Sequence, residues 1–202
     1  MAEWREFHPP HVYEQNACYF VTAGTVGRQR LLDTAPRRAL LRDILRGAVR
    51  DYAITLHAWV ILANHYHLLL QTGSTIPVWK FIKRLHGESA IRLNELDGTP
   101  GRKVWYQYWD HSPRGQSGFW SCFNYVHINP LKHGYVRACT EALLLQGGQF
   151  RIASGRYPEV HEALAHYPFS SYHAYMREYG EAFMTSTWTH YPIPERFAHD
   201  DP

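Results

Sequence analysis

The chain has 202 residues and a net charge of +3, and its 45% of hydrophobic and 15% of aromatic residues are enough for one packed domain with a tail. Its longest apolar runs are far shorter than the roughly 20 residues of a membrane span, and its first residues lack the basic and apolar regions of a signal peptide. The three cysteines, an odd number without a CxxC spacing, argue against a disulfide framework and favour a reducing, cytoplasmic location.

The first third of the chain predicts one helix among three strands. Residues 17–26 are apolar and rich in residues that favour strands, whereas residues 31–52 carry apolar side chains at helical period. Residues 53–62 predict a buried strand whose alternate apolar residues lie on one face. Residues 65–72 follow after a short, turn-prone dipeptide, and we therefore expect them to form its hairpin partner.

The next elements alternate helix and strand. Residues 75–98 predict a helix with Thr75 as its N-cap, residues 104–113 an aromatic strand, and residues 118–136 a helix that Pro130 ends or kinks. Strand pairs separated by helices favour an α+β sandwich, with an antiparallel or mixed central sheet and helices packed on one face.

The pattern weakens after residue 138. Residues 146–160 are typical of a loop, and residues 167–180 predict one short helix. We therefore divide the chain into a domain of residues 1–137 and a C-terminal extension, residues 138–202, that packs on this domain.

The charge is unevenly distributed between these two parts. Residues 1–137 hold 17 Lys or Arg against 10 Asp or Glu, whereas residues 138–202 hold 4 against 8. A basic body with an acidic tail favours a polyanionic partner for the body, although a solvated basic face explains the charge equally well.

Two histidines one residue apart stand out in the apolar segment ILANHYHLLLQT, residues 61–72. Side chains at i and i+2 of a strand share a face, so His65 and His67 project together with Cα atoms roughly 6.6 Å apart. Two imidazoles at that spacing can bind one divalent ion, but a pair of surface or hydrogen-bonded histidines explains the spacing as well. The HxHxDH, HxE with PCxxC, and HExxH patterns of zinc enzymes are absent from the sequence.

A second polar group lies in FNYVHINP, residues 123–130. Tyr125 and Asn129 are four residues apart and therefore share one face of a helix, whereas His127 faces away and is expected to be structural. The Asn129 carbonyl oxygen is a suitable ligand for Mg²⁺ or Mn²⁺. The Tyr125 phenol is a usable nucleophile once a base or a nearby positive charge favours its ionised form, but a core aromatic is the simpler interpretation.

The segments ANHYHLLL and YVHINPLKHGYV, in this order and at this spacing, resemble the HUH single-strand transposases with one catalytic tyrosine. More narrowly they are similar to the REP-associated tyrosine transposases, and the resemblance covers roughly residues 15 to 175. It departs from the family pattern at Ala63, where proline is more usual, and at Tyr66, which is bulky for the middle position of the histidine motif.

The resemblance implies a fold, a set of ligands and a reaction. The fold is an α+β sandwich with a central antiparallel sheet, of the ferredoxin-like or RRM-like kind. His65, His67 and Asn129 would bind Mg²⁺ or Mn²⁺, and Tyr125 would attack single-stranded DNA to give a 5′-phosphotyrosine link. The expected substrates are hairpins formed by repeated extragenic palindromes, and relatives act as monomers or as homodimers.

Basic residues of the body are the expected DNA contacts, and exposed aromatic side chains among them would stack on unpaired bases. Core packing is the simpler role for any one aromatic residue. The basic candidates are Arg38, Arg42, Arg46, Lys80, Lys83, Arg84, Arg102 and Lys103, and the aromatic candidates are Trp59, Trp79, Trp105, Tyr106 and Trp109.

Two other functions are compatible with the same residues. One is a non-catalytic DNA-binding regulator of the same fold, and the other is a metal hydrolase that uses water in place of Tyr125. Neither would form a covalent bond between the protein and DNA.

Overall fold

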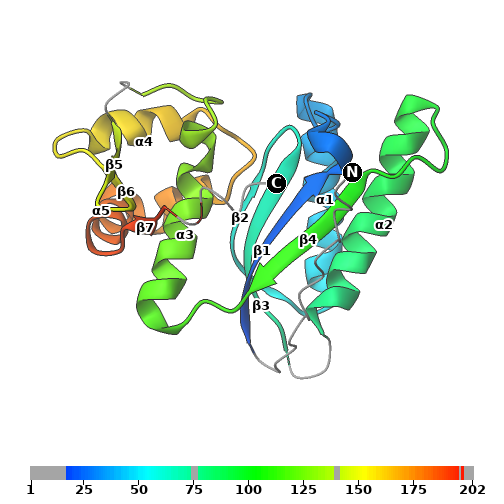
Figure 1. Ribbon diagram of the computed structural model, residues 1–202, viewed down its shortest axis with the longest axis horizontal. Coiled ribbons are helices and arrows are strands. Elements are labelled where there is room, and N and C mark those ends of the chain that lie inside the picture. Colours follow the sequence, from blue (N-terminus) through cyan, green and yellow to red (C-terminus); the bar gives the residue numbers. More distant parts are fainter. Residues whose placement is uncertain (1–16, 74–76, 139–141, 196, 198–202) are drawn as a thin grey trace, which may run out of the picture.

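The computed structural model describes residues 17–73, 77–138, 142–195 and 197 (Figure 1). The expected Thr75 cap and Cys139 lie outside these residues. The first part contains β1 (Cys18–Thr25), the 3₁₀ turn η1 (Val26–Arg28), α1 (Ala35–Asp51), β2 (Thr55–Ile61), β3 (His65–Gln71), α2 (Val78–Asp97), β4 (Trp105–His111) and α3 (Gly115–Lys132). The second part contains β5 (Leu143–Gln146), β6 (Gln149–Ile152), α4 (Tyr157–Ala165), α5 (Tyr172–His190) and β7 (Ile193–Pro194).

Four strands form the central sheet in the order β2-β3-β1-β4, and all neighbours are antiparallel. This confirms the α+β fold with a central antiparallel sheet and the hairpin of β2 and β3. β3 lies inside the sheet, and helices cover both of its faces, which explains why its residues form a nearly continuous apolar run. Leu68, Leu69 and Leu70 are all completely buried.

Helices cover both faces of the sheet, and the expectation that they pack on one face was wrong. α1 and α2 lie side by side on one face, whereas α3 lies on the other, between the sheet and the C-terminal elements (Figure 1). The alternation along β3 requires this arrangement. Tyr66 donates or accepts a hydrogen bond with His86 of α2 at 2.7 Å, so the neighbouring residues His65 and His67 face α3.

The expected one-sided apolar stripe of β2 is interrupted. A bulge shifts the pairing with β3, so that Leu56 lies opposite Leu70 whereas Ala58 lies opposite Leu69. Because residues opposite one another share a face, Leu56 and Ala58 project to different faces of the sheet.

The C-terminal residues are more regular than predicted. The expected loop over 146–160 contains β6 and the start of α4, and β6 pairs with β5 in a hairpin closed by Gly147 and Gly148, both with positive φ. α5 has 19 residues and replaces the short helix predicted there. These elements pack against α3 through α4, α5 and β7. No helix in the described part of the chain is long and apolar enough to cross a membrane.

An ion-pair cluster fixes the end of α2 beside the start of α1. Asp97 accepts hydrogen bonds from the guanidinium groups of Arg37 and Arg102, the latter at 2.6 Å. These two arginines lower the pKa of the Asp97 carboxyl to about 2. The helix ends at the next residue, Gly98, whose positive φ of 62° allows the chain to turn towards β4.

We expect Asp97→Asn to lower the free energy of unfolding at pH 7 by about 1 kcal/mol, because partly exposed ion pairs are screened by water. A carboxyl with a lowered pKa stabilises the fold above its unfolded pKa near 4, and this contribution is lost as the pH falls through about 2. Urea unfolding at a series of pH values would therefore show the variant and the wild type converging between pH 4 and pH 2. Asp43→Asn, at an exposed ion pair of α1, is the control. A difference in unfolding free energy between Asp97→Asn and the wild type that stays constant down to pH 2 would contradict a lowered pKa for Asp97.

Candidate active site

Two histidines of β3 form the centre of the candidate site. His65 and His67 are buried, with exposed fractions of 3% and 0%, and their rings lie edge to face with centroids 5.1 Å apart. The Nδ1 atom of His65 lies 2.8 Å from Asn64 Oδ1, and that of His67 lies 2.8 Å from Thr22 Oγ1 of β1. Because Nδ1 is engaged in both rings, the buried Nε2 atoms are the nitrogens with which these rings would bind a metal.

Tyr125 of α3 packs against His67 of this pair. Its ring centroid is 5.1 Å from that of His67, in an edge-to-face arrangement within the same chain. Phe20 of β1 and Phe197 near the C-terminus pack on the same phenol, with centroids 5.9 and 5.5 Å away. Tyr125 is completely buried. The structure therefore brings the late helix and the histidine strand together, as the sequence motifs predicted.

Asn129 lies one helical turn after Tyr125 and is also completely buried. Its Nδ2 atom donates a hydrogen bond to the Tyr125 carbonyl oxygen at 3.4 Å. Its Oδ1 atom is buried and accepts no hydrogen bond from any described residue. A buried acceptor in this condition costs free energy unless a cation or another donor satisfies it, so the side chain fits a metal ligand.

The donor set contains no carboxylate. Among the described residues, no group of three or more His, Cys, Asp and Glu side chains is arranged to hold a metal ion. The two imidazole nitrogens and the Asn129 amide oxygen therefore make a neutral set, which fits a Mg²⁺ or Mn²⁺ ion that shares its remaining positions with a charged substrate.

Sequence reasoning missed several residues of this site, among them Thr22, Lys132 and His133, whose ring lies 4.9 Å from that of His65 between centroids. Thr22 contacts His67 only because β1 and β3 pair in the register that puts them opposite one another. Lys132 donates a hydrogen bond to the Tyr125 hydroxyl at 3.1 Å. The signal for Lys132 was present, since it follows Tyr125 by seven residues, two helical turns, on one face of α3.

His127 is structural, as predicted from its position. It is completely buried, and its Nε2 atom lies 2.7 Å from Ser171 Oγ. Burial lowers the pKa of this imidazole to about 3, so it is neutral at physiological pH. Ser171 also accepts a hydrogen bond from the Trp59 backbone of β2 at 2.9 Å, so this contact fixes α3 against the edge of the sheet.

The sequence model of one family, described as "Transposase IS200 like", matches residues 15–127, more than half of the chain. The chain belongs to the IS200-like transposase family. A curated REP-associated tyrosine transposase from Escherichia coli (strain K12) is 25% identical over 150 residues, which cover 70% of this chain and 79% of the relative. A solved structure of a REP-associated tyrosine transposase bound to a REP hairpin shares the fold, with a TM-score of 0.59 and 20% identity over 88% of this chain and 86% of that chain. These comparisons confirm the resemblance found in the sequence.

The basic residues expected to contact DNA divide into two groups in the transposase. Arg38 and Arg102 make contacts inside the protein. Arg38 donates a hydrogen bond to the Leu32 carbonyl oxygen at 2.9 Å, and Arg102 forms an ion pair with Asp97. The others lie at the surface of α1, α2 and the start of β4. Lys80, Lys83 and Arg84 line an open groove on the outer face of α2 together with Trp79 and Tyr52.

The groove of α2 and the tyrosine site lie on opposite faces of the sheet, because α2 covers the face of Tyr66 and α3 the face of His67 (Figure 1). Between them runs β4, an edge strand of the described sheet, with Tyr106 and Trp109 exposed at 39% and 40%. Of the five aromatic candidates for base stacking, Trp105 is the one that is buried in the core.

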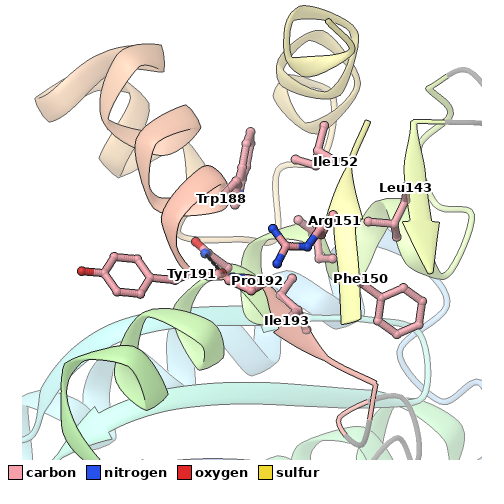
Figure 2. A pocket seen from close by; sticks show the side chains of 10 residues that line it. Leu143, Phe150, Arg151, Ile152, Trp188, Tyr191, Pro192 and Ile193 are labelled. Atoms are coloured by element: carbon pink, nitrogen blue, oxygen red, sulfur yellow. Dashed lines mark hydrogen bonds between the residues drawn. The ribbon is translucent and has the colours of Figure 1, made fainter. Parts of the chain in front are cut away.

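A small cavity lies among the C-terminal elements of the transposase (Figure 2). It has room for about one water molecule and is therefore too small for a nucleotide. Asn124 Oδ1 and Trp188 Nε1 lie beside it, both buried and without a hydrogen-bond partner within the described chain. A bridging water would satisfy both atoms, so we interpret the cavity as structural.

We expect Phe197→Ala to expose the Tyr125 ring, because Phe197 packs on it together with Phe20 and His67. Nitration by tetranitromethane, followed by peptide mass mapping, would show a higher rate of modification at Tyr125 and an unchanged rate at the exposed Tyr179. Phe150→Ala, in the β5–β6 hairpin, is the matched control. Equal nitration of Tyr125 in both variants would show that other groups are sufficient to cover it.

Proposed function

We propose that this transposase cleaves and rejoins single-stranded DNA at hairpin-forming repeats through a covalent bond between Tyr125 and a 5′ phosphate. The observation that carries the proposal is the position of the Tyr125 phenol, 5.1 Å from the ring of His67 in the same chain. In this proposal each chain holds the nucleophile and the metal site side by side. A monomer, or either subunit of a dimer, would therefore carry a complete site without residues from a partner.

His65, His67 and Asn129 would hold a Mg²⁺ or Mn²⁺ ion in this proposal. Such an ion, when bound, neutralises charge on a non-bridging oxygen of the scissile phosphate and helps to orient it. The buried, unsatisfied Asn129 oxygen and the engaged Nδ1 atoms of both histidines support this role. The surrounding apolar side chains, Phe20 among them, exclude water and strengthen the electrostatic interactions at the site.

Tyr125 would attack the phosphorus atom in line with the bond to the 3′ oxygen. The tyrosine O–P bond forms, the P–O3′ bond breaks, the phenol proton is lost to water, and the departing 3′ oxygen takes a proton from water. Attack by a 3′ hydroxyl on the phosphotyrosine reverses these steps and joins strands. The phosphodiester energy is kept in the tyrosine ester, so rejoining needs no nucleotide cofactor.

A phosphate reaches Tyr125 only after a covering group moves, because the phenol is completely buried. Phe197 is the covering side chain nearest the end of the chain, and its ring also packs on Phe20 and His111. We therefore include in the proposal that DNA binding displaces Phe197 from the site.

The relative solved with a REP hairpin suggests hairpin DNA as the substrate class. In this chain, Lys80 and Lys83 of α2 would contact the phosphates of such DNA, and Lys103 at the start of β4 would extend the contact towards the edge of the sheet. Tyr106 and Trp109 on β4 would stack on bases of the single strand that passes from that edge to Tyr125.

We expect the purified protein to form a covalent adduct with hairpin-flanked single-stranded oligonucleotides in Mn²⁺, seen as a slower band on a denaturing gel. Tyr125→Phe removes the attacking oxygen and should abolish the adduct, whereas Tyr179→Phe on the surface of α5 should leave it unchanged. DNA binding without an adduct would favour the non-catalytic regulator, and cleavage without an adduct would favour a hydrolase that uses water.

We expect Thr22→Val to weaken Mn²⁺ binding about 10- to 100-fold, because groups that hydrogen-bond to the other nitrogen of a metal-binding histidine contribute on that scale. The valine keeps the shape of threonine but removes the hydroxyl that contacts His67 Nδ1 at 2.8 Å. Isothermal titration of Mn²⁺ in the absence of DNA measures this effect independently of activity. The exposed Thr189→Val in α5 is the matched control, and equal affinity in the two variants would argue against His67 as a ligand.

A further inference from the structure

We infer that Lys132 is a further catalytic residue, whose ammonium group holds the Tyr125 oxygen and stabilises the negative charge on it while its bond to phosphorus forms and breaks. The inference rests on the proposed function, since it concerns the oxygen that would attack DNA.

The geometry directs Lys132 at the reacting atom. Its Nζ lies 3.1 Å from the Tyr125 hydroxyl oxygen, whereas its distance from the centroid of the phenol ring is 5.0 Å. The lysine is the last residue of α3 and follows Tyr125 by two helical turns, so the helix itself sets the spacing of the two side chains.

The surroundings strengthen the interaction. Tyr125 is completely buried and Lys132 is half-buried, so water screens this charge less than it would at an exposed position. The ring of His67 lies edge to face with the same phenol, with centroids 5.1 Å apart. The tyrosine is therefore in contact both with one imidazole of the histidine pair and with the ammonium of Lys132.

The metal-binding residues and Lys132 would act on different atoms in the reaction. The histidines and Asn129 face the scissile phosphate in the proposed function, whereas Lys132 contacts the tyrosine oxygen. During cleavage, that oxygen carries partial negative charge after its proton passes to water and before its bond to phosphorus is complete. During rejoining, the P–O bond to tyrosine breaks and the same oxygen leaves as a phenolate, which takes a proton from water afterwards. The ammonium stabilises the charge on this oxygen in both directions.

A purely structural Lys132 would behave differently. A basic residue in the last turn of a helix also interacts favourably with the helix dipole, and its loss would then change stability without changing the rate of the chemical step. A lysine that contacts DNA would change affinity and not the rate at saturating DNA. The two directions of the reaction provide a further test, because a group that stabilises one transition state accelerates cleavage and rejoining equally.

The experiment compares Lys132→Met, Lys132→Arg and the wild type in single-turnover assays with saturating hairpin-flanked oligonucleotide and Mn²⁺. We expect Lys132→Met to slow both adduct formation and its reversal by a 3′ hydroxyl about 10- to 100-fold, the scale for loss of one charged donor at a transition state. Lys132→Arg should recover part of this loss, because it restores the positive charge. The affinity for DNA, measured with Tyr125→Phe in the background, should stay within about twofold, since the contact is with tyrosine.

Arg50→Met, which removes one positive charge from the exposed end of α1, is the matched control and should leave both rates unchanged. Thermal unfolding of each variant distinguishes a variant that does not fold from a folded variant that reacts slowly. If Lys132→Met does not fold, Lys132→Arg is the deciding variant. A Lys132→Arg protein that reacts more slowly than the wild type, at equal affinity for DNA, supports the inference. Wild-type rates in a folded Lys132→Met, or a change in affinity alone, would overturn it. Absence of an adduct in the wild type would instead overturn the proposed function.

Discussion

The pairing of β1 with β3 is the constraint on which the site depends. In this register Thr22 lies opposite His67 and Gly24 lies opposite His65. A shift by one residue would turn both histidines to the face of α1 and α2 and bring Tyr66 to the face of α3, because side chains alternate along a strand. The apolar residues of β3 lock the register, since Leu68 and Leu70 fill the core under the two helices.

The second requirement is that α3 lies flat on the histidine face. All residues from 121 to 130 are buried, which is unusual for a helix at the side of a sheet. The C-terminal elements explain it by covering the outer side of α3. Asn124 donates to the Thr187 and Tyr191 carbonyl oxygens at 2.8 and 2.7 Å, and Ser121 donates to the Pro192 carbonyl oxygen at 2.9 Å. The end of α5 is thereby hydrogen-bonded to α3 at Asn124, the residue that precedes Tyr125.

This arrangement gives an electrostatic environment in which a phenol can act as a nucleophile. Burial by itself disfavours the phenolate, so a buried tyrosine needs positive charge nearby. In this chain Lys132 supplies a charge at the hydroxyl, and the proposed ion would supply another beside the histidines. In the proposed function, the same burial would close the site to DNA until Phe197 moves. The proposed nucleophile would then be both activated and covered, as suits an enzyme that must act only on a correctly bound strand.

The sequence by itself determined the elements of the main sheet, the two motifs and their order. Periodicity is a local property, and it therefore predicted the β2–β3 hairpin and the helical spacing of Tyr125 and Asn129. The sequence also predicted that the helices pack on one face of the sheet, which was wrong. The periodicity of a helix shows that one of its sides is apolar, but it does not show on which face of the sheet the helix packs. The β5–β6 hairpin was missed since its short, glycine-separated strands carry too few residues to show a period. Only the tertiary structure decided that Tyr125 meets His67, that Thr22 supports that imidazole and that Phe197 covers the phenol. Each of these contacts joins residues far apart in the chain, and the packing of the whole domain fixes them.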